Sequence, residues 1–270
     1  MSYNSICTLG QFIPTNNMLG IKRIFLIIVF WVSMLCHGEI IQFSVAKQDC
    51  FIITNNTSVV EWKSINTTNS LKVVHRNASN WGLPTLDKYK ISFQDATPLE
   101  FSSLMPIAYK KIFIVAQAND IKSWATLLDA SKGLSIAPDI FSVTNGENFQ
   151  FYNFTGGFQI YVNGENTNNA PINQSFIVEL SLDEPLNLNN VFIGGSPAAL
   201  EWERSWNGDI YEILFVDEDL TEDQYSAIYT YLSIKHKIPV AIELNDNAYA
   251  ILKALNVSSE PAFTTMILMR

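Results

Sequence analysis

The chain has 270 residues, of which 48% are hydrophobic, and its formal net charge is −9. This length and composition allow a substantial buried core. The acidic balance, with Lys and Arg scattered singly along the chain, argues against nucleic acid or an anionic lipid surface as a partner.

The first predicted element is an export signal. Lys22 and Arg23 precede an apolar run, residues 24–36, and Gly38 offers a small residue before a cleavage site. A basic region, a short apolar region and a small-residue exit are typical of a secretory signal peptide. The alternative is an uncleaved anchor, but a membrane span needs about 20 apolar residues. We therefore expect residues 1–38 to be an N-terminal extension plus signal peptide, and a mature chain that is secreted or on the cell surface without a membrane span.

Removal of this segment would take away Lys22 and Arg23 and lower the formal charge from −9 to −11. It would also leave Cys50 as the only cysteine, so that no intrachain disulfide can form and the core alone must stabilise the domain. Cys50 directly precedes the strand-like run Phe51–Ile53. We predict that it is a buried structural residue rather than a reactive thiol.

Alternating and continuous apolar patterns predict roughly ten to twelve β-strands between residues 40 and 217. Asn163-Gly164 predicts a two-residue hairpin turn, because both residues tolerate a positive φ. The run Ile112–Ala116 predicts a strand that is covered on both faces. Three alternating rows are expected to point inward, namely Tyr89, Ile91 and Phe93; Phe158, Ile160 and Val162; and Phe176, Val178, Leu180 and Leu182.

A single well-capped helix is predicted directly after the last strand. Thr221 and Gln224 have the spacing of a capping box, and Pro239 ends the helix. An apolar stripe follows the cap, made of Tyr225, Ile228, Tyr229 and Leu232. The cations Lys235, His236 and Lys237 are expected to favour the negative end of the helix dipole. A second, shorter helix is predicted from Asp246 to Leu255, with Asp246 as its cap.

Five segments in the second half of the chain form one combined pattern. They are Tyr161-Val162-Asn163-Gly164, Ile193-Gly194-Gly195, Gly208–Ile213, Leu220-Thr221 and Tyr231–Ile238. In this order they resemble the LamG-like, concanavalin A-like jelly-roll domains. Val60-Glu61-Trp62, Tyr89–Gln94 and Ala125–Gly133 match the earlier strands of that family more loosely.

The resemblance implies an all-β fold, a two-sheet antiparallel jelly-roll sandwich with one capped C-terminal helix. The domain would cover residues 39–240, followed by a C-terminal extension of residues 241–270 with a short helix and a tail. Members of this family include glycan-binding modules, adhesion modules and some hydrolases, so the fold does not fix the function.

Pairs of carboxylates are the first candidates for catalysis, because glycan hydrolysis uses two acids. Glu201 and Glu203 bracket Trp202 in a loop and form the best such pair. A second group, Glu179 with Asp183 and Glu184, lacks a middle acid and ends at Pro185. A third, Asp217–Asp219, directly precedes the helix cap, where acids favour a helix N-terminus. We therefore expect a non-catalytic module.

Metal and nucleophile sites have weaker signals. His75 and His236 lie outside any recognisable zinc or nucleophile motif. Calcium is left open as a bound ion, with Asp139, Asp183 and Asn187 as candidate ligands, although such residues are also common in turns. No other cofactor is expected.

Aromatic side chains in loops offer the most plausible recognition chemistry, because sugar rings stack on them. Trp81, Trp202 and Arg204 are the candidate ligand-binding residues. Trp206 directly precedes a strand and is expected in the core. Glu212 is expected to be a structural acid that a neighbouring loop or helix satisfies.

The sequence thus predicts a secreted, non-catalytic module that binds carbohydrate or an extracellular protein through rim loops. The first alternative is a hydrolase or lyase that acts on polysaccharide and uses Glu201 and Glu203. The second is a structural or adhesion domain without a small ligand. A groove shared by Trp81 and Trp202 would favour the main prediction.

Overall fold

The structure is a computed structural model that describes residues 40–73, 82–94, 96–102, 108–120, 125–130, 135–144, 147–153, 157–187, 191–196 and 205–258. The predicted export signal lies outside these residues. None of the helices in the ranges just given has the length and hydropathy of a membrane-spanning segment.

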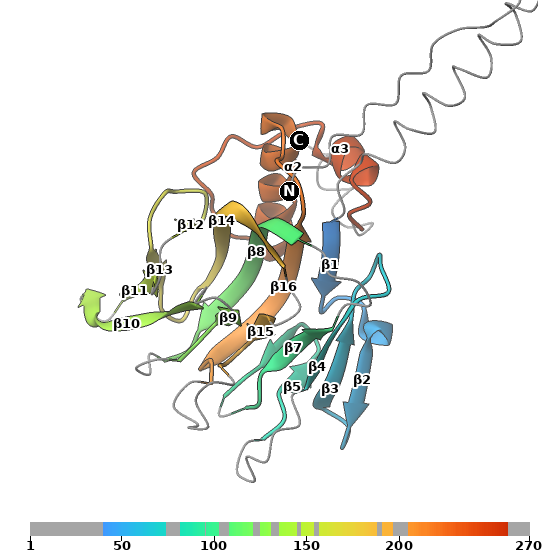
Figure 1. The fold of residues 1–270 in the computed structure, drawn as a ribbon, viewed down its shortest axis with the longest axis vertical. Coiled ribbons are helices and arrows are strands. Elements are labelled where there is room, and N and C mark those ends of the chain that lie inside the picture. Colours follow the sequence, from blue (N-terminus) through green and yellow to red (C-terminus); the bar gives the residue numbers. More distant parts are fainter. Residues whose placement is uncertain are drawn as a thin grey trace, which may run out of the picture. The chain divides into compact units, whose positions relative to one another are not determined.

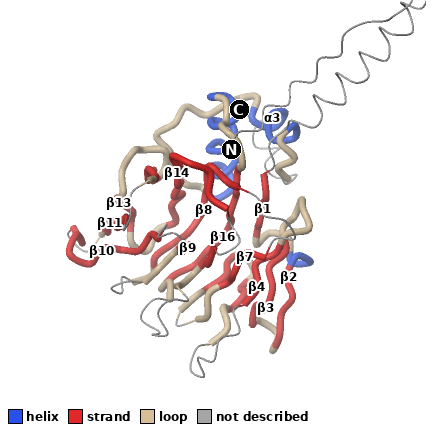
Figure 2. Tube along the Cα trace, in the orientation of Figure 1, coloured by secondary structure: helices blue, strands red, loops and turns tan. Residues whose placement is uncertain are grey.

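Sixteen strands among the described residues join into one curled sheet, in which all pairs of strands are antiparallel (Figures 1 and 2). One limb has the order β12 (Phe158–Val162), β14 (Ser175–Asn187), β8 (Ala108–Ala118) and β16 (Gly208–Val216), and β1 (Ile40–Ser44) pairs with β16. The strands β6 (Lys90–Ser92) and β5 (Thr85–Asp87) connect it to the second limb. The all-β class predicted from the sequence is therefore confirmed.

The second limb contains the remaining strands. Its order is β3 (Ser58–Lys63), β4 (Ser70–Val73), β7 (Leu99–Ser102), β15 (Val191–Ile193), β9 (Leu128–Ala130), β10 (Ser135–Thr144), β11 (Asn148–Asn153) and β13 (Asn169–Pro171), while β2 (Phe51–Thr54) pairs with β3. A short 3-10 turn, Gln48–Cys50, precedes β2. The strand count exceeds the sequence prediction because five strands of the whole sheet, namely β5, β6, β9, β13 and β15, are only three residues long and leave too little pattern to detect.

Aromatic contacts between the two limbs show where the main core lies. The rings of Phe101 on β7 and Phe215 on β16 are 5.3 Å apart, and Phe43 on β1 lies 5.6 Å from Trp62 on β3. All four side chains are almost fully buried. Because β3 and β7 belong to one limb and β1 and β16 to the other, the curled sheet packs face to face with itself around an apolar core.

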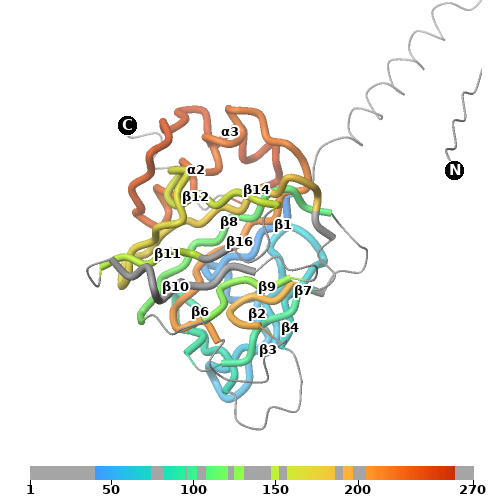
Figure 3. The backbone as a smooth tube through the Cα atoms, turned by 60° about the vertical axis from the view of Figure 1, so that its left-hand side comes forward, coloured from blue at the N-terminus to red at the C-terminus, as the bar shows by residue number. Residues whose placement is uncertain are grey.

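The first limb is also covered on its outer face. On β8, Ile112 and Ile114 point into the main core, whereas Phe113 and Val115 belong to a second cluster beneath helix α2 (Glu222–His236). Figure 3 shows α2 and the shorter helix α3 (Ala248–Ala254) lying together next to this limb. The prediction that Ile112–Ala116 is a strand covered on both faces is confirmed.

Helix α2 has the predicted ends. The Gln224 backbone N–H donates to Thr221 Oγ1 at 3.2 Å, and the Thr221 N–H donates to the Gln224 side chain at 2.8 Å, which completes the capping box. Lys237 closes the helix in the left-handed conformation, with φ 56°. These caps satisfy backbone groups that the helix itself cannot pair.

Three local predictions were wrong. Tyr89 does not point inward; it lies in the two-residue turn between β5 and β6 and is 62% exposed. Asp246 does not cap the second helix, because Asn247 holds the N-cap position and makes no side-chain capping bond. Cys50 is half-buried at the edge of the main core rather than buried, because the 3-10 turn that it ends lies at the surface.

Glu212 on β16 is fully buried beneath the C-terminal half of α2. Its Oε2 lies 2.7 Å from His236 Nε2 and 3.1 Å from Lys235 Nζ, and its Oε1 accepts hydrogen bonds from Tyr231 and Gln42. The prediction of a structural acid satisfied by a neighbouring helix is confirmed. Two of the cations expected at the helix dipole instead neutralise this buried carboxylate.

Glu179 on β14 plays the corresponding role beneath the N-terminal half of α2. Lys111 Nζ lies 2.9 Å from its Oε1, and the hydroxyls of Tyr225 and Tyr229 donate to Oε2 at 2.7 and 2.8 Å. Burial, together with the adjacent carboxylate, raises the pKa of both tyrosines. Both hydroxyls therefore stay protonated and act as donors.

The contacts of Glu212 predict a pH dependence of stability. Burial raises the pKa of this carboxyl, but the charges and hydrogen bonds of Lys235, His236 and Tyr231 lower it more, from 4.5 to about 2. A carboxyl whose pKa is lower in the folded state stabilises the fold above its unfolded pKa. This contribution is complete above about pH 4.5 and is lost as the pH falls toward 2.

We expect Glu212→Gln to lower the free energy of unfolding at pH 7 by about 3–5 kcal/mol, because it breaks a buried ion pair. The variant should also lose part of the decline in stability between pH 4.5 and 2. Urea denaturation across this pH range measures both effects. The matched control is Glu184→Gln, an exposed carboxylate on β14, with an expected change within about 0.5 kcal/mol. Equal stabilities of the two variants would contradict the prediction.

Candidate functional site

Most of the site residues predicted from the sequence lie outside the described residues. This applies to the ligand-binding candidates Trp81, Trp202 and Arg204 and to the carboxylate pair Glu201 and Glu203. Their roles stay predictions.

The segment that directly precedes β16, from Ser205 to Asn207, is firmly anchored. The Ser205 hydroxyl donates to the Phe93 carbonyl at 2.5 Å and accepts from the Ala96 N–H at 2.9 Å. Trp206 is 1% exposed, and its ring stacks on Phe151 at an interplanar angle of 17°. The prediction that Trp206 packs in the core is confirmed. Its burial fixes the position of the chain where β16 begins.

The other acidic candidates are separated by burial. Glu179 is fully buried beneath α2, whereas Asp183 and Glu184 farther along β14 are exposed, so Glu179 does not pair with either of them. The side chains of the remaining calcium candidates, Asp139 and Asn187, lie outside the described residues. Within the described ranges, no three His, Cys, Asp or Glu side chains come together as metal ligands. Calcium binding stays a prediction.

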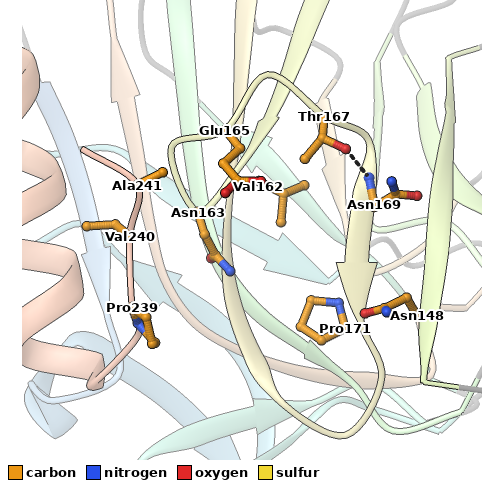
Figure 4. Close-up of a pocket in the computed structure, with 10 residues that line it drawn as sticks. All are labelled: Asn148, Val162, Asn163, Glu165, Thr167, Asn169, Pro171, Pro239, Val240 and Ala241. Carbon is orange, nitrogen blue, oxygen red and sulfur yellow. Dashed lines mark hydrogen bonds between the residues drawn. The ribbon is translucent and has the colours of Figure 1, made fainter.

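A cavity of about 480 Å³ lies between β12 of the first limb and β11 and β13 of the second (Figure 4). Its walls come from β11, from the end of β12 and the turn after it, from β13, and from the segment after α2. Half of its lining is polar and half is apolar. The polar residues are Asn148, Asn163, Glu165, Thr167 and Asn169, and the apolar residues are Val162, Pro171, Pro239, Val240 and Ala241.

The two-residue turn after β12 forms one wall of this cavity. Asn163 and Gly164 have φ values of 52° and 83°, as the predicted two-residue turn requires. Val162 and Glu165 exchange backbone hydrogen bonds of 2.9 and 3.0 Å across the turn. The predicted two-residue turn at Asn163-Gly164 is confirmed, but it does not join two paired strands, because Val162 and Glu165 form an isolated bridge and β12 pairs with β14. The turn places Asn163 and Glu165 at the cavity.

The segment that follows α2 forms the opposite wall. The Ala241 N–H donates to the Asn163 carbonyl at 2.9 Å, which fixes residues 239–241 against the turn. Ile242 packs so closely that a Cβ added to Gly164 would lie 2.6 Å from its Cγ1. Gly164 is therefore required both for its positive φ and for this close approach.

The polar side chains of the cavity are partly held in place. Asn163 Oδ1 accepts from the Ile177 N–H at 2.9 Å, and Thr167 Oγ1 accepts from the Asn169 N–H at 3.2 Å (Figure 4). Among the described residues of the lining, Glu165 alone is charged. Amide groups both donate and accept hydrogen bonds, so the cavity suits a neutral molecule rich in hydroxyl or amide groups.

Sequence reasoning detected the turn at Asn163-Gly164 but missed the cavity. The only local signal was the run of amide side chains between residues 163 and 169. The other walls, at Asn148 and at Pro239–Ala241, are far from this run in the sequence. Tertiary contacts bring them together.

Comparisons with protein-family models, with curated proteins and with solved structures gave no match. The resemblance to concanavalin A-like domains thus rests on the sequence motifs. The described residues define an all-β protein with a curled antiparallel sheet, a helix packed on its outer face and a cavity between its two limbs.

We expect Gly164→Ala to destabilise the protein, because it combines an unfavourable φ with a clash against Ile242. The left-handed conformation alone costs about 1–2 kcal/mol for a residue with a Cβ. Gly157→Ala is a matched control, since Gly157 also has φ 83° but no atom within 4 Å of an added Cβ. Chemical denaturation should show a larger loss for Gly164→Ala. An equal loss of stability in the two variants would mean that the Ile242 side chain moves aside without destabilising the protein.

Proposed function

We propose that this protein is a secreted, non-catalytic module that binds a neutral carbohydrate in the cavity between the β12 turn and the segment after α2. The observation that carries the proposal is the lining itself, in which Asn148, Asn163 and Asn169 stand beside Thr167 and Glu165. The predicted export signal and the resemblance to concanavalin A-like domains support it independently.

The chemistry of carbohydrate matches this lining. Each sugar hydroxyl both donates and accepts a hydrogen bond, and an asparagine amide can serve both needs. Pro171, Pro239 and Val240 offer apolar surface for the C–H groups of a sugar ring. The single carboxylate of Glu165 disfavours acidic sugars such as uronic acids, because like charges repel.

The jelly-roll topology belongs to the same proposal. The turn at Asn163-Gly164, the strand β16 and the capped helix α2 support it, because they form at the sequence motifs on which the resemblance to concanavalin A-like domains rests. Two limbs of an antiparallel sheet that pack around one core are also what such a sandwich needs. Trp81, Trp202 and Arg204, in the predicted rim loops, would add contacts to a sugar that is bound in the cavity.

The test uses an array of neutral oligosaccharides followed by calorimetry with the sugars that bind. We expect Asn148→Ala and Asn169→Ala each to weaken binding by about threefold to tenfold, the cost of one lost hydrogen bond. The control is Asn247→Ala at the exposed N-cap of α3, where the side chain makes no capping bond. This variant should bind like the natural protein.

Two results would contradict the proposal. The first is an array without any bound glycan, both with and without calcium, which would favour a protein partner or an adhesion role. The second is binding that Asn148→Ala and Asn169→Ala leave unchanged, which would move the site to the rim loops. Binding that requires calcium would support the predicted calcium ligands.

A further inference from the structure

The outer face of the first limb carries a row of polar side chains beyond the area that α2 covers. Ser175 of β14 pairs with Gln117 of β8, Gln117 with Asp209 of β16, and Asp209 with Ser92 of β6. Residues directly opposite each other on neighbouring strands point to the same face. These four side chains, named the polar row, therefore lie side by side across four strands.

The polar row begins where the helix cover ends. The apolar cluster beneath α2 includes Val115 of β8 and Ile177 of β14. Gln117 and Ser175 lie two residues farther along these strands, on the same face, and both are only partly buried. Their side chains are thus placed to meet a ligand on the sheet surface.

Hydrogen bonds hold the polar row in one arrangement. Asp209, which is 1% exposed, accepts hydrogen bonds from Ser92 and from Lys90 Nζ, the latter at 2.9 Å. Gln117 donates to Asn119 at 2.9 Å. The charges of Lys90 and Asp209 cancel, so the row offers polar groups without a net charge.

A β-bulge adds an aromatic ring to this surface. On β16, Ile210 pairs with Ala116 and Glu212 with Val115, so Tyr211 is an extra residue. Such bulges redirect side chains and occur often beside functional sites. The Tyr211 hydroxyl donates to Gln117 Oε1 at 3.1 Å, which places the ring next to the row.

The polar row starts close to the cavity. Asn163 Oδ1 accepts from the Ile177 N–H, and Ser175 precedes Ile177 by two residues on the same strand. Two strand residues span about 7 Å. From there the row crosses three strand intervals, or about 14 Å, which is longer than one sugar ring.

We propose that the polar row is a second carbohydrate subsite, which extends the cavity into a track for an oligosaccharide of several neutral sugar units. This inference rests on the proposed function of the cavity. Gln117, Ser175 and Asn119 would hydrogen-bond the sugar hydroxyls along the track. Tyr211 would contact the face of one ring.

The test is the dependence of affinity on chain length. Calorimetry would use disaccharides and hexasaccharides of β-glucan, β-mannan, xylan and chitin. For a series that binds, we expect the hexasaccharide to bind at least about tenfold more tightly, since it gains several hydrogen bonds. Gln117→Ala and Ser175→Ala should each weaken the binding of the hexasaccharide by about threefold and leave the binding of the disaccharide unchanged.

The matched control is Gln159→Ala, an exposed glutamine on β12 outside the polar row, which should leave both affinities unchanged. Asn169→Ala in the cavity should weaken disaccharide and hexasaccharide alike. Thermal melting confirms that each variant folds.

Two results would overturn the inference in different ways. The first is an equal affinity for disaccharide and hexasaccharide, or hexasaccharide binding that Gln117→Ala and Ser175→Ala leave as unchanged as Gln159→Ala does. Either outcome would exclude the track and leave the cavity as the binding site. The absence of binding to all four series would remove both the track and the proposed function of the cavity.

Discussion

Glu179 and Glu212 project from β14 and β16 into the layer beneath α2, where both are fully buried. A buried carboxylate is tolerated only when it is paired and hydrogen-bonded. Lys111 supplies the charge for Glu179, whose other partners are two tyrosines of the helix, while Lys235 and His236 of the helix itself neutralise Glu212. These contacts at both ends of α2 hold the helix in its observed position on the sheet.

That position decides where both candidate binding surfaces lie. The helix ends at Lys237, and the chain then returns to the β12 turn, where Ala241 bonds to Asn163 and closes the cavity wall. The same helix covers the apolar residues of β8 and β14 but not Gln117 and Ser175. The cavity and the polar row are thus consequences of how two buried charges are satisfied.

Local patterns were sufficient where the structure depends on neighbours in the chain. The capping box at Thr221, the two-residue turn at Asn163-Gly164 and the inward row from Phe158 to Val162 were predicted correctly, since each uses residues only a few positions apart. Tyr89 was placed wrongly because an alternating pattern does not show where a strand gives way to a tight turn. Glu179 lies on the strand face opposite Phe176 and Val178, and an alternating pattern does not show that α2 buries this second face.

The sequence by itself determined the all-β class and the capped helix, because alternation and capping depend on residues a few positions apart. It indicated a structural role for Glu212, but its partners Lys235 and His236 are brought to it only by the packing of α2. Only the tertiary structure decided which face α2 covers, and with it the burial of Glu179. It alone also assembled the cavity, whose walls at Asn148, Asn163 and Pro239–Ala241 are distant in the chain. The physical reason is that a binding surface depends on strand register and helix packing, and neither can be read from a segment in isolation.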